Sequence, residues 1–426
     1  MKPISIATAA RQQSEEERFI KISTLAGGVS IGALILFGLS SCSDDKELPL
    51  PELTEKTYTG ANTLRLTYDG YDMPGKSVTV TPGENGAATL TLFSEFDLSQ
   101  LDLKGVSGTI PAPGVIPGDI RTVLTPQLTG GNGFRSFNGT ADTGKVSFSY
   151  SGKIYADSLV MNVTDARLAD VTLDGMAWKL APLTKKNDGL GYESLPFHIV
   201  WEAHPIEGID IPLSEILRVA VTVPCIPVYH DTAYSSIAQL LSQLIQTVKW
   251  MPDGNIIVTY ISTVGGATRI ATLNGTTLQY TVENPQYFKL YVNPLSVAGL
   301  ALTSGVLTGG DLPLSDKQLE SILPVVKQLV GKLAPQIAGG IPLAFSKTEN
   351  ALSVYVDQNL AVPVLQTILE TILSDSSRLQ LFMAELQKYP EIAAQIPEIM
   401  KVIQQLPAYI EQTTRFEFGF DFIPYK

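Results

Sequence analysis

The sequence has few of the residues from which metal sites, disulfide frameworks and many active sites are built. Its 426 residues include only two cysteines, three histidines and three tryptophans. Two cysteines exclude a framework of several disulfides, and no Cys/His spacing predicts a zinc site. Basic residues are also outnumbered, 30 against 42 acidic ones, which gives a formal net charge of −12. Because an acidic protein repels phosphate backbones, we expect no nucleic-acid partner.

A long apolar run near the N-terminus predicts export. It covers residues 22–39 and is preceded by Arg18 and Lys21, the charge-then-apolar order of a secretory signal. Its 18 residues also approach the roughly 20 that span a bilayer, so a transmembrane anchor is the alternative. Four glycines make the run a poor anchor. We therefore interpret it as a signal segment.

The apolar run ends in Leu39, Ser40, Ser41 and Cys42. This sequence resembles a bacterial lipobox, in which an aliphatic residue and two small residues precede the cysteine that receives a diacylglycerol. The resemblance implies that residues 1–41 are a signal peptide and that the mature chain begins at lipidated Cys42, attached to a membrane. Residues 1–41 carry four basic and three acidic side chains, so their removal changes the net charge from −12 to −13.

Residues 42–56 form an acidic, Pro-containing tether. Ser43, Asp44 and Asp45 follow the cysteine directly and are similar to the surface-export signal of Bacteroidetes lipoproteins. That similarity implies an outer-membrane protein that faces the extracellular side. The alternative is an ordinary solvated linker, because charged, Pro-rich segments do not fold alone.

Lipidation of Cys42 leaves Cys225 without an intramolecular partner. Cys225 lies in the apolar run VTVPCIPV, so we expect a buried thiol that packs as a small hydrophobic side chain.

Residues 57–180 predict an antiparallel β-domain. Short alternating segments such as TLRLTY and KVSFSY are separated by turns, and SVTVTPGENGAATLTL predicts a hairpin that turns at Asn85-Gly86. The region resembles the calycin-like domains of Bacteroidetes lipoproteins, which are small lipocalin-related barrels. The resemblance implies a β-barrel, from which the Gly/Pro-rich segment between residues 105 and 134 would be an irregular excursion.

Residues 181–194 are polar and contain glycine, which predicts a linker, and residues 195–426 predict a mixed α+β domain. LPFHIVWEAH predicts a strand, Asp231 is a candidate helix cap, and hairpins are expected at Pro252–Asn255 and at Asn274-Gly275.

Later in this domain Ser315 and Gln318 form a candidate capping box, and IPLAFSKTENALSVYV predicts another hairpin. Helix is expected between about residues 360 and 413, divided by Pro390, Pro397 and Pro407. The terminal RFEFGFDF alternates aromatic and polar residues, as a half-buried strand does. This half resembles uncharacterised Bacteroidetes lipoproteins classed as a domain of unknown function, so the resemblance implies no activity.

Few residues point to chemistry. A G-x-S-x-G match at residues 28–32 lies inside the signal segment and is discarded. His198 and His204 lie near Glu202, but three converging ligands are not predicted, and neither these histidines nor His230 has a local nucleophile as partner. We therefore predict no metal, no cofactor and no catalytic residues.

Trp178, Trp201 and Trp250 either stack on sugars or pack in the core, which is the commoner role of large aromatic side chains. Taken together, the sequence predicts a non-catalytic binding module on the cell envelope, for an apolar ligand or a glycan. A structural partner of an outer-membrane complex and a glycan-acting hydrolase are the alternatives.

Overall fold

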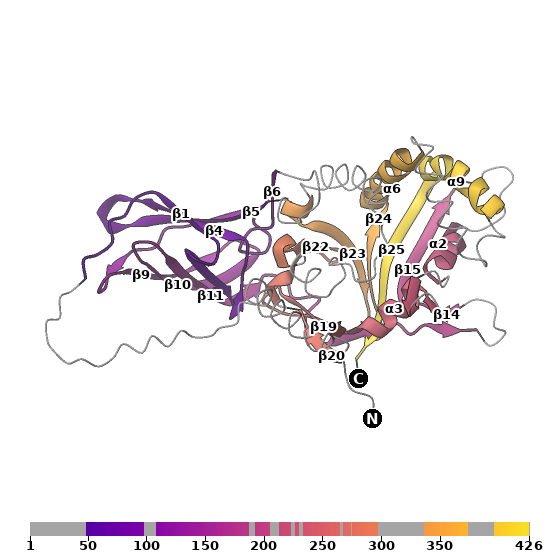
Figure 1. Ribbon diagram of the computed structural model, residues 1–426, viewed down its shortest axis with the longest axis horizontal. Helices are drawn as coiled ribbons and strands as arrows, with labels where there is room; N and C mark the ends of the chain where they lie inside the picture. Colours follow the sequence, from indigo (N-terminus) through magenta and orange to yellow (C-terminus); the bar gives the residue numbers. More distant parts are fainter. Residues whose placement is uncertain are drawn as a thin grey trace, which may run out of the picture.

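The computed structural model describes residues 48–97, 108–186, 192–204, 213–222, 226–229, 233–264, 267–273, 275–296, 336–373 and 396–425. Within these ranges the protein is mostly β-structure with few helices, and its sheets are curled. Two curled sheets form one end of the molecule, and helices α2, α6 and α9 gather at the other end (Figure 1). The lipobox, residues 43–45, Cys225, His230 and the Ser315 capping box lie outside the described residues.

The first half contains two sheets. The five-stranded sheet has the order β1 (Lys56–Thr59), β4 (Lys76–Pro82), β5 (Ala88–Asp97) and β6 (Thr109–Pro111), with β7 (Arg121–Leu124) also paired to β5. The predicted hairpin β4–β5 is confirmed, and a 3-10 turn at Glu84–Gly86 joins its strands.

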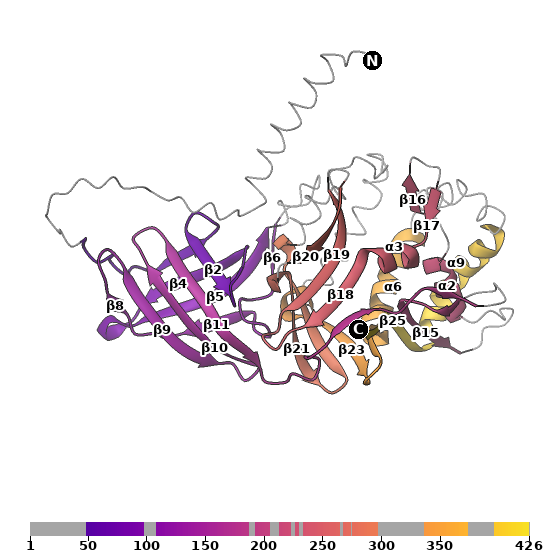
Figure 2. The same cartoon turned by 90° about the horizontal axis from the view of Figure 1, so that it is seen from below.

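The six-stranded sheet has the order β3 (Tyr71–Asp72), β2 (Leu64–Tyr68), β11 (Leu159–Leu168), β10 (Val146–Ile154), β9 (Arg135–Asp142) and β8 (Thr129–Gly130). Figure 2 shows β9, β10 and β11 side by side. β2 and β11 pair in parallel, whereas the other ladders of this sheet are antiparallel. The expectation of a purely antiparallel domain is therefore wrong at this one ladder.

The two sheets turn their apolar sides toward each other. Strand β5 buries every second residue, including Leu90 and Leu92, because side chains alternate between the faces of a strand. Met161 and Val163 of β11 are fully buried in the same core. In the described residues no ladder joins the two sheets, so they are two half-barrels where the sequence analysis expected one closed barrel.

Residues 112–117 fill part of this core, and we call them the plug segment. All six residues are buried, although their Pro/Gly-rich composition predicted an irregular excursion. Lys76 of β4 is 3% exposed, and its Nζ donates hydrogen bonds to the carbonyl oxygens of Pro113 at 2.6 Å and Gly114 at 3.0 Å. Gly114 cannot carry a side chain, because a Cβ there would overlap the Asp119 carbonyl oxygen.

The second half is built on a ten-stranded sheet. Its order is β20 (Ala267–Thr272), β19 (Ile256–Val264), β18 (Ile245–Trp250), β12 (Ala177–Leu180), β25 (Thr413–Pro424), β24 (Leu352–Asp357), β23 (Ile341–Lys347), β22 (Tyr287–Val292) and β21 (Leu278–Asn284), with β15 (Phe197–Ala203) also on β25. The sequence predicted that β12 belongs to the first domain, but β12 pairs with β18 and β25 of the ten-stranded sheet. The predicted linker contains the hairpin of β13 (Thr184–Lys185) and β14 (Tyr192–Ser194).

Helices cover part of the apolar face of this sheet. They are α2 (Leu213–Thr222), α3 (Ile237–Leu244), α6 (Gln358–Leu373) and α9 (Ile396–Glu411), and a small hairpin joins β16 (Ile226–Tyr229) to β17 (Ala233–Ser235). Trp201 and Phe416 of the sheet pack with Leu213 of α2 and Tyr409 of α9. The apolar residues of each helix therefore lie against the aromatic side of β15 and β25.

Of three hairpins predicted in the second half, two are present in the structure. The hairpins at Pro252–Asn255 and between β23 and β24 are confirmed. The hairpin at Asn274-Gly275 is wrong: β20 pairs with β19 and β21 with β22, while a 3-10 turn, Gly275–Thr277, lies between them.

Two predicted helix boundaries were also wrong. Residues 233–235 after Asp231 form strand β17, and α3 is capped instead by Ser236, which makes a capping box with Gln239. Pro407 lies inside α9 and does not divide it.

The two halves share one core. Tyr68 and Met161 of the half-barrels and Trp250 and Phe288 of the ten-stranded sheet belong to the same cluster of buried side chains. Hydrogen bonds cross the junction as well: the Tyr68 hydroxyl donates to the Asp253 carbonyl oxygen at 2.6 Å. The halves are therefore packed together by buried apolar contacts as well as joined along the chain.

Candidate functional site

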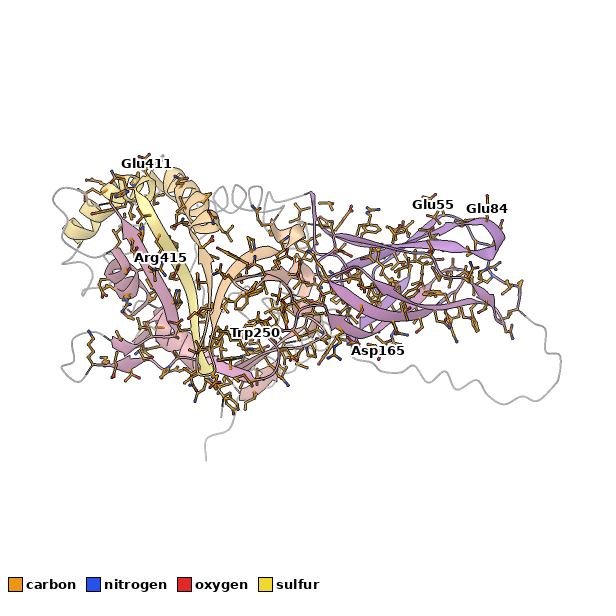
Figure 3. All side chains as sticks on the ribbon, turned by 180° about the vertical axis from the view of Figure 1, so that it is seen from behind. Glu55, Glu84, Asp165, Trp250, Glu411 and Arg415 are labelled. Carbon is orange, nitrogen blue, oxygen red and sulfur yellow. The ribbon has the colours of Figure 1, made fainter. Side chains whose placement is uncertain are left out.

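Strand β25 has two faces of opposite character. Phe416, Phe418, Phe420 and Phe422 face the helices and the core, while the intervening residues Arg415, Glu417, Gly419 and Asp421 point to the other side. Figure 3 shows Arg415 on this long strand and Glu411 at the end of the preceding helix α9. The sequence predicted this alternation, and the structure shows what surrounds the polar side.

Three ring side chains line up across the polar side of the sheet. The pairing register runs from Tyr287 through Ala344, Tyr355 and Gly419 to His198, so these five residues share one row and one face. Small residues thus separate the rings. The rings of His198 and Tyr355 stack over Gly419, with centroids 4.5 Å apart and planes at 23°. We call this row, with the polar side chains around it, the ring face.

His198 is held from both sides by carboxylates. Its Nε2 lies 2.8 Å from Glu417 Oε2 and its Nδ1 lies 3.2 Å from Asp421 Oδ1. Ser353 donates a hydrogen bond of 2.6 Å to the same Asp421 oxygen. The imidazole can therefore donate through both nitrogens only in its protonated form.

Electrostatics favour that charged form. Burial lowers the pKa of His198, but the hydrogen bonds with Asp421 and Glu417 outweigh it, so the pKa is raised above its ordinary value. Burial raises the pKa of Glu417, but hydrogen bonds with Arg415 and His198 outweigh it and leave the pKa lowered. In the same way, burial raises the pKa of Asp421, and hydrogen bonds with His198 and Ser353 leave it lowered. The two hydrogen bonds and the directions of all three pKa shifts favour a protonated imidazole between two carboxylates.

Further polar groups extend the ring face on both sides. Arg415 Nε lies 2.8 Å from Glu417 Oε1, and its guanidinium is 3.6 Å from Glu202. The Tyr287 hydroxyl donates a 2.9 Å hydrogen bond to Asp357 Oδ2, which raises the pKa of Tyr287. Hydrogen bonds thus orient the rings of Tyr287 and His198, and the central Tyr355 ring is positioned by stacking on His198.

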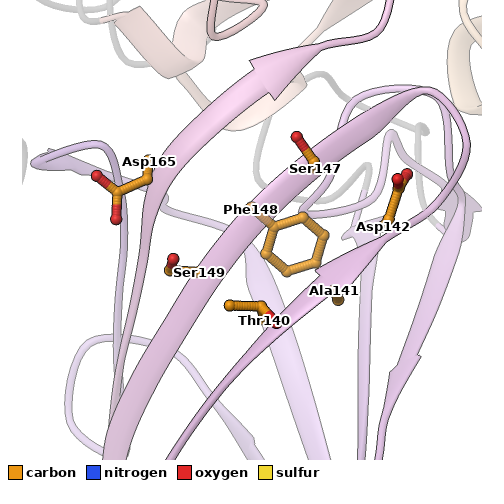
Figure 4. Close-up of a pocket in the computed structure, with 7 residues that line it drawn as sticks. All are labelled: Thr140, Ala141, Asp142, Ser147, Phe148, Ser149 and Asp165. Atoms are coloured by element: carbon orange, nitrogen blue, oxygen red, sulfur yellow. The ribbon is translucent and has the colours of Figure 1, made fainter.

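The first half has a different surface feature, an open hollow of about 420 Å³ on β9 and β10. Figure 4 shows Asp142 and Asp165 at its two sides, with Phe148 between them. Asp165 has a φ of +55°, which is uncommon for a residue with a side chain. The hollow is open to solvent along the sheet, and Phe148 in its lining is almost entirely buried, which leaves polar side chains as most of its exposed wall.

Asp69 lies near this hollow, at the junction of the two halves. Burial and the charge of Asp253 raise the pKa of Asp69 to about 6, although the Ala166 amide donates a hydrogen bond to its carboxylate. This group marks a strained turn, since Asp69 also has a positive φ of 45°.

The candidate site residues predicted from the sequence lie in different environments. Trp178, Trp201 and Trp250 are at most 5% exposed and pack in the core, so none can stack on a sugar. His198 belongs to the ring face, whereas His204 and Glu202 are exposed. Within the described ranges no group of three His, Cys, Asp or Glu side chains could hold a metal ion.

Sequence reasoning missed the partners of His198. Glu417 and Asp421 are more than two hundred residues away from His198 in the sequence. The one local signal was the alternation in RFEFGFDF, which places both carboxylates on the polar side of the predicted strand. No helix of the described ranges is both long and apolar enough to cross a membrane. Comparison of the chain with known protein families, with curated proteins and with solved structures gave no match.

Proposed function

We propose that this protein is a lipid-anchored binding protein of the bacterial cell envelope, and that the ring face is the surface that binds its ligand. The observation that carries the proposal is the fixed row Tyr287, Tyr355 and His198 on a sheet face turned away from the helices. Rigid tyrosine rings offer a large contact area at little cost in conformational entropy.

A glycan is the ligand class that this surface fits best. The C–H bonds on one side of a sugar ring pack well against the negative face of an aromatic ring, and sugar hydroxyls pair with carboxylates and with hydroxyls such as that of Ser353. An apolar ligand inside the first half is disfavoured, because Val78, Leu90, Leu92 and Val163 fill that interior and are fully buried. The calycin-like resemblance remains a proposal about shape, without a lipocalin-type ligand.

Two observations support the proposed membrane anchor: the lipobox-like sequence that ends at Cys42 and the packing of the chain from Leu48 onward. The Leu48 amide donates a hydrogen bond to Asn132 Oδ1 at 2.6 Å, and the Pro51 carbonyl accepts one from Arg135 Nε at 3.0 Å. The second part of the predicted tether is thus packed on the first half, near β8 and β9. Six residue steps from Cys42 to Leu48 reach at most about 20 Å. We propose that this end faces the membrane and that the second half extends outward.

Binding is favoured over glycan hydrolysis at the ring face. A glycosidase needs one carboxylic acid with a raised pKa beside a second carboxylate. Glu417 and Asp421 both have lowered pKa values because both pair with His198. Neither is therefore suited to protonate a leaving group. A structural role beside an outer-membrane partner would use the same exposed face and is the second candidate.

The decisive experiment is binding of the purified protein to a panel of soluble polysaccharides by affinity electrophoresis and calorimetry. We expect Tyr355→Ala to weaken binding at least about fivefold, because a central aromatic contact is lost. Tyr155→Ala in the first half is the matched control and should bind like wild type. Equal affinity of wild type and the Tyr355→Ala variant would refute the ring face as the binding surface. Protease shaving of intact cells tests surface exposure, and protection until lysis would contradict it.

A further inference from the structure

A pocket of about 190 Å³ lies between helix α2 and the hairpin β13–β14. The hairpin contributes Lys186 and Tyr192, and α2 contributes one stripe, Glu215, Arg218, Val219 and Thr222. These four positions have the spacing i, i+3, i+4 and i+7, which places them on one face of a helix. None of the residues that line the pocket belongs to the ring face, although the Arg218 charge reaches Asp421 and helps to lower its pKa.

Two sides of α2 explain why the pocket exists. Leu213, Leu217 and Val221 turn into the apolar clusters against Trp201 and Ile199. The opposite stripe is polar apart from Val219, and of the described residues near the hairpin only Lys186, Tyr192 and Leu195 line the pocket beside it. The helix is therefore fixed by its core side and leaves its polar side beside a cavity.

The pocket contains a buried hydrogen-bond donor on an otherwise half-exposed side chain, since the Arg218 side chain as a whole is 43% exposed and forms an ion pair with Glu215. The Nε of Arg218 is buried, and the described part of the chain offers it no hydrogen-bond acceptor. Its nearest carboxylate oxygen, Glu215 Oε1, is 3.6 Å away, which is too long for a hydrogen bond. A desolvated donor without a partner is unfavourable, and an acceptor bound in the pocket would remove that cost.

Charge narrows the choice of acceptor. Lys186 and Arg218 contribute two positive charges to the walls and Glu215 one negative charge, which leaves a formal charge of +1. A monoanion balances this charge. A phosphate, with about −1.5 to −2 at neutral pH, would be repelled by Glu215. The planar guanidinium also matches the two oxygens of a carboxylate.

We propose that this pocket binds a small hydroxylated monocarboxylate. The carboxylate accepts from Arg218 and Lys186, and the hydroxylated body lies along Tyr192 and Val219. The cavity of about 190 Å³ is smaller than the pockets of about 300–1,000 Å³ that hold drug-sized ligands, which restricts the ligand to about the size of a single sugar acid. This site does not depend on the ring face being a binding surface.

Calorimetric and NMR titrations of the full protein with D-glucuronate, D-glucose, acetate and inorganic phosphate test the proposal. We expect glucuronate to bind most tightly, acetate more weakly, and glucose and phosphate more weakly still. Arg218→Gln should weaken glucuronate binding at least about tenfold, since a charge-assisted pair is lost. Glu215→Gln should strengthen binding, because a competing carboxylate is removed.

The controls separate this site from general electrostatics and from the ring face. Arg167→Gln makes the same charge change on an exposed residue of the first half and should leave glucuronate affinity unchanged, as should Tyr355→Ala. Thermal melts confirm that each variant is folded. The proposal is overturned if glucuronate shows no binding up to about 20 mM, if glucose or phosphate binds as tightly, or if folded Arg218→Gln protein binds like wild type.

Discussion

In the first half, two sheets turn their apolar sides toward each other and share the core with the plug segment. In the second half, the ten-stranded sheet buries only one of its sides, and the other side is polar and carries the row of rings. One titratable group in each half, Lys76 and the half-buried His198, differs in the same way. In the described residues the hydrogen-bond partners of Lys76 are two carbonyl oxygens, and burial lowers its pKa to about 7. His198 has two carboxylates, and its pKa is raised.

This difference shows how closure of a core restricts function. Both sides of a sandwich-like pair are used for stability, because each sheet needs the other to bury its apolar side. The ten-stranded sheet is stabilised from one side by helices and by the first half, so residues on its other side are free to serve recognition. Substitutions in the first half should therefore change stability, and those on the ring face should change binding.

The largest effect is expected in the plug segment. Gly114→Ala would bring a Cβ into the Asp119 carbonyl oxygen, and backbone cannot move aside as a flexible side chain can. We expect a loss of about 2–4 kcal/mol in the free energy of unfolding, measured by urea denaturation. Gly339→Ala is the control, since a Cβ at Gly339 meets no atom within 4 Å. An equal, small effect of both substitutions would show that the plug segment is not tightly packed.

The second effect concerns Lys76. Its pKa of about 7 in the folded protein lies below the ordinary 10.5, so above pH 7 the folded state has released a proton that the unfolded state still binds. Stability should therefore rise from pH 7 toward pH 10, by up to a few kcal/mol from this group. Lys76→Met should remove that rise. Lys56→Met, on an exposed lysine, is the comparison, and a rise that persists in Lys76→Met would contradict the assignment.

The smallest effect is expected on the ring face. Because its folded pKa is raised, His198 stabilises the protein below its ordinary pKa of 6.5, and this contribution is lost as the pH rises through the higher folded value. The paired carboxylates have lowered pKa values, so the same contribution is lost in strong acid. His198→Gln should cost less than about 1 kcal/mol, since the pairs are partly exposed.

The measurement is a comparison of denaturation curves of wild type and His198→Gln between pH 5 and pH 9. The difference should shrink as the pH rises. If the difference in unfolding free energy between wild type and His198→Gln does not change with pH, the imidazole is neutral in the folded protein. That result would remove the contrast between a charged ring face and a first half with a buried lysine.

Parts of the fold were predictable where the pattern was local. The alternation in RFEFGFDF and the turn residues at Pro252–Asn255 specify a strand and a hairpin within a few residues. The ends of α3 were not predictable from Asp231, because the Ser236 capping box nearby competes with it. The burial of residues 112–117 was hidden as well, since Pro and Gly indicate irregular backbone without indicating where that backbone packs.

The sequence by itself determined the β-strand character of the first half, the acidic charge of the chain and the two faces of β25, because these depend on composition and on a period of two residues. It also carries the pattern at Cys42 from which we propose a lipid anchor. Only the tertiary structure decided that β12 joins the second sheet, that His198 meets Glu417 and Asp421, and that Arg218 faces a pocket. Such contacts join residues far apart in the chain, and they are fixed by register and packing, which no local pattern encodes.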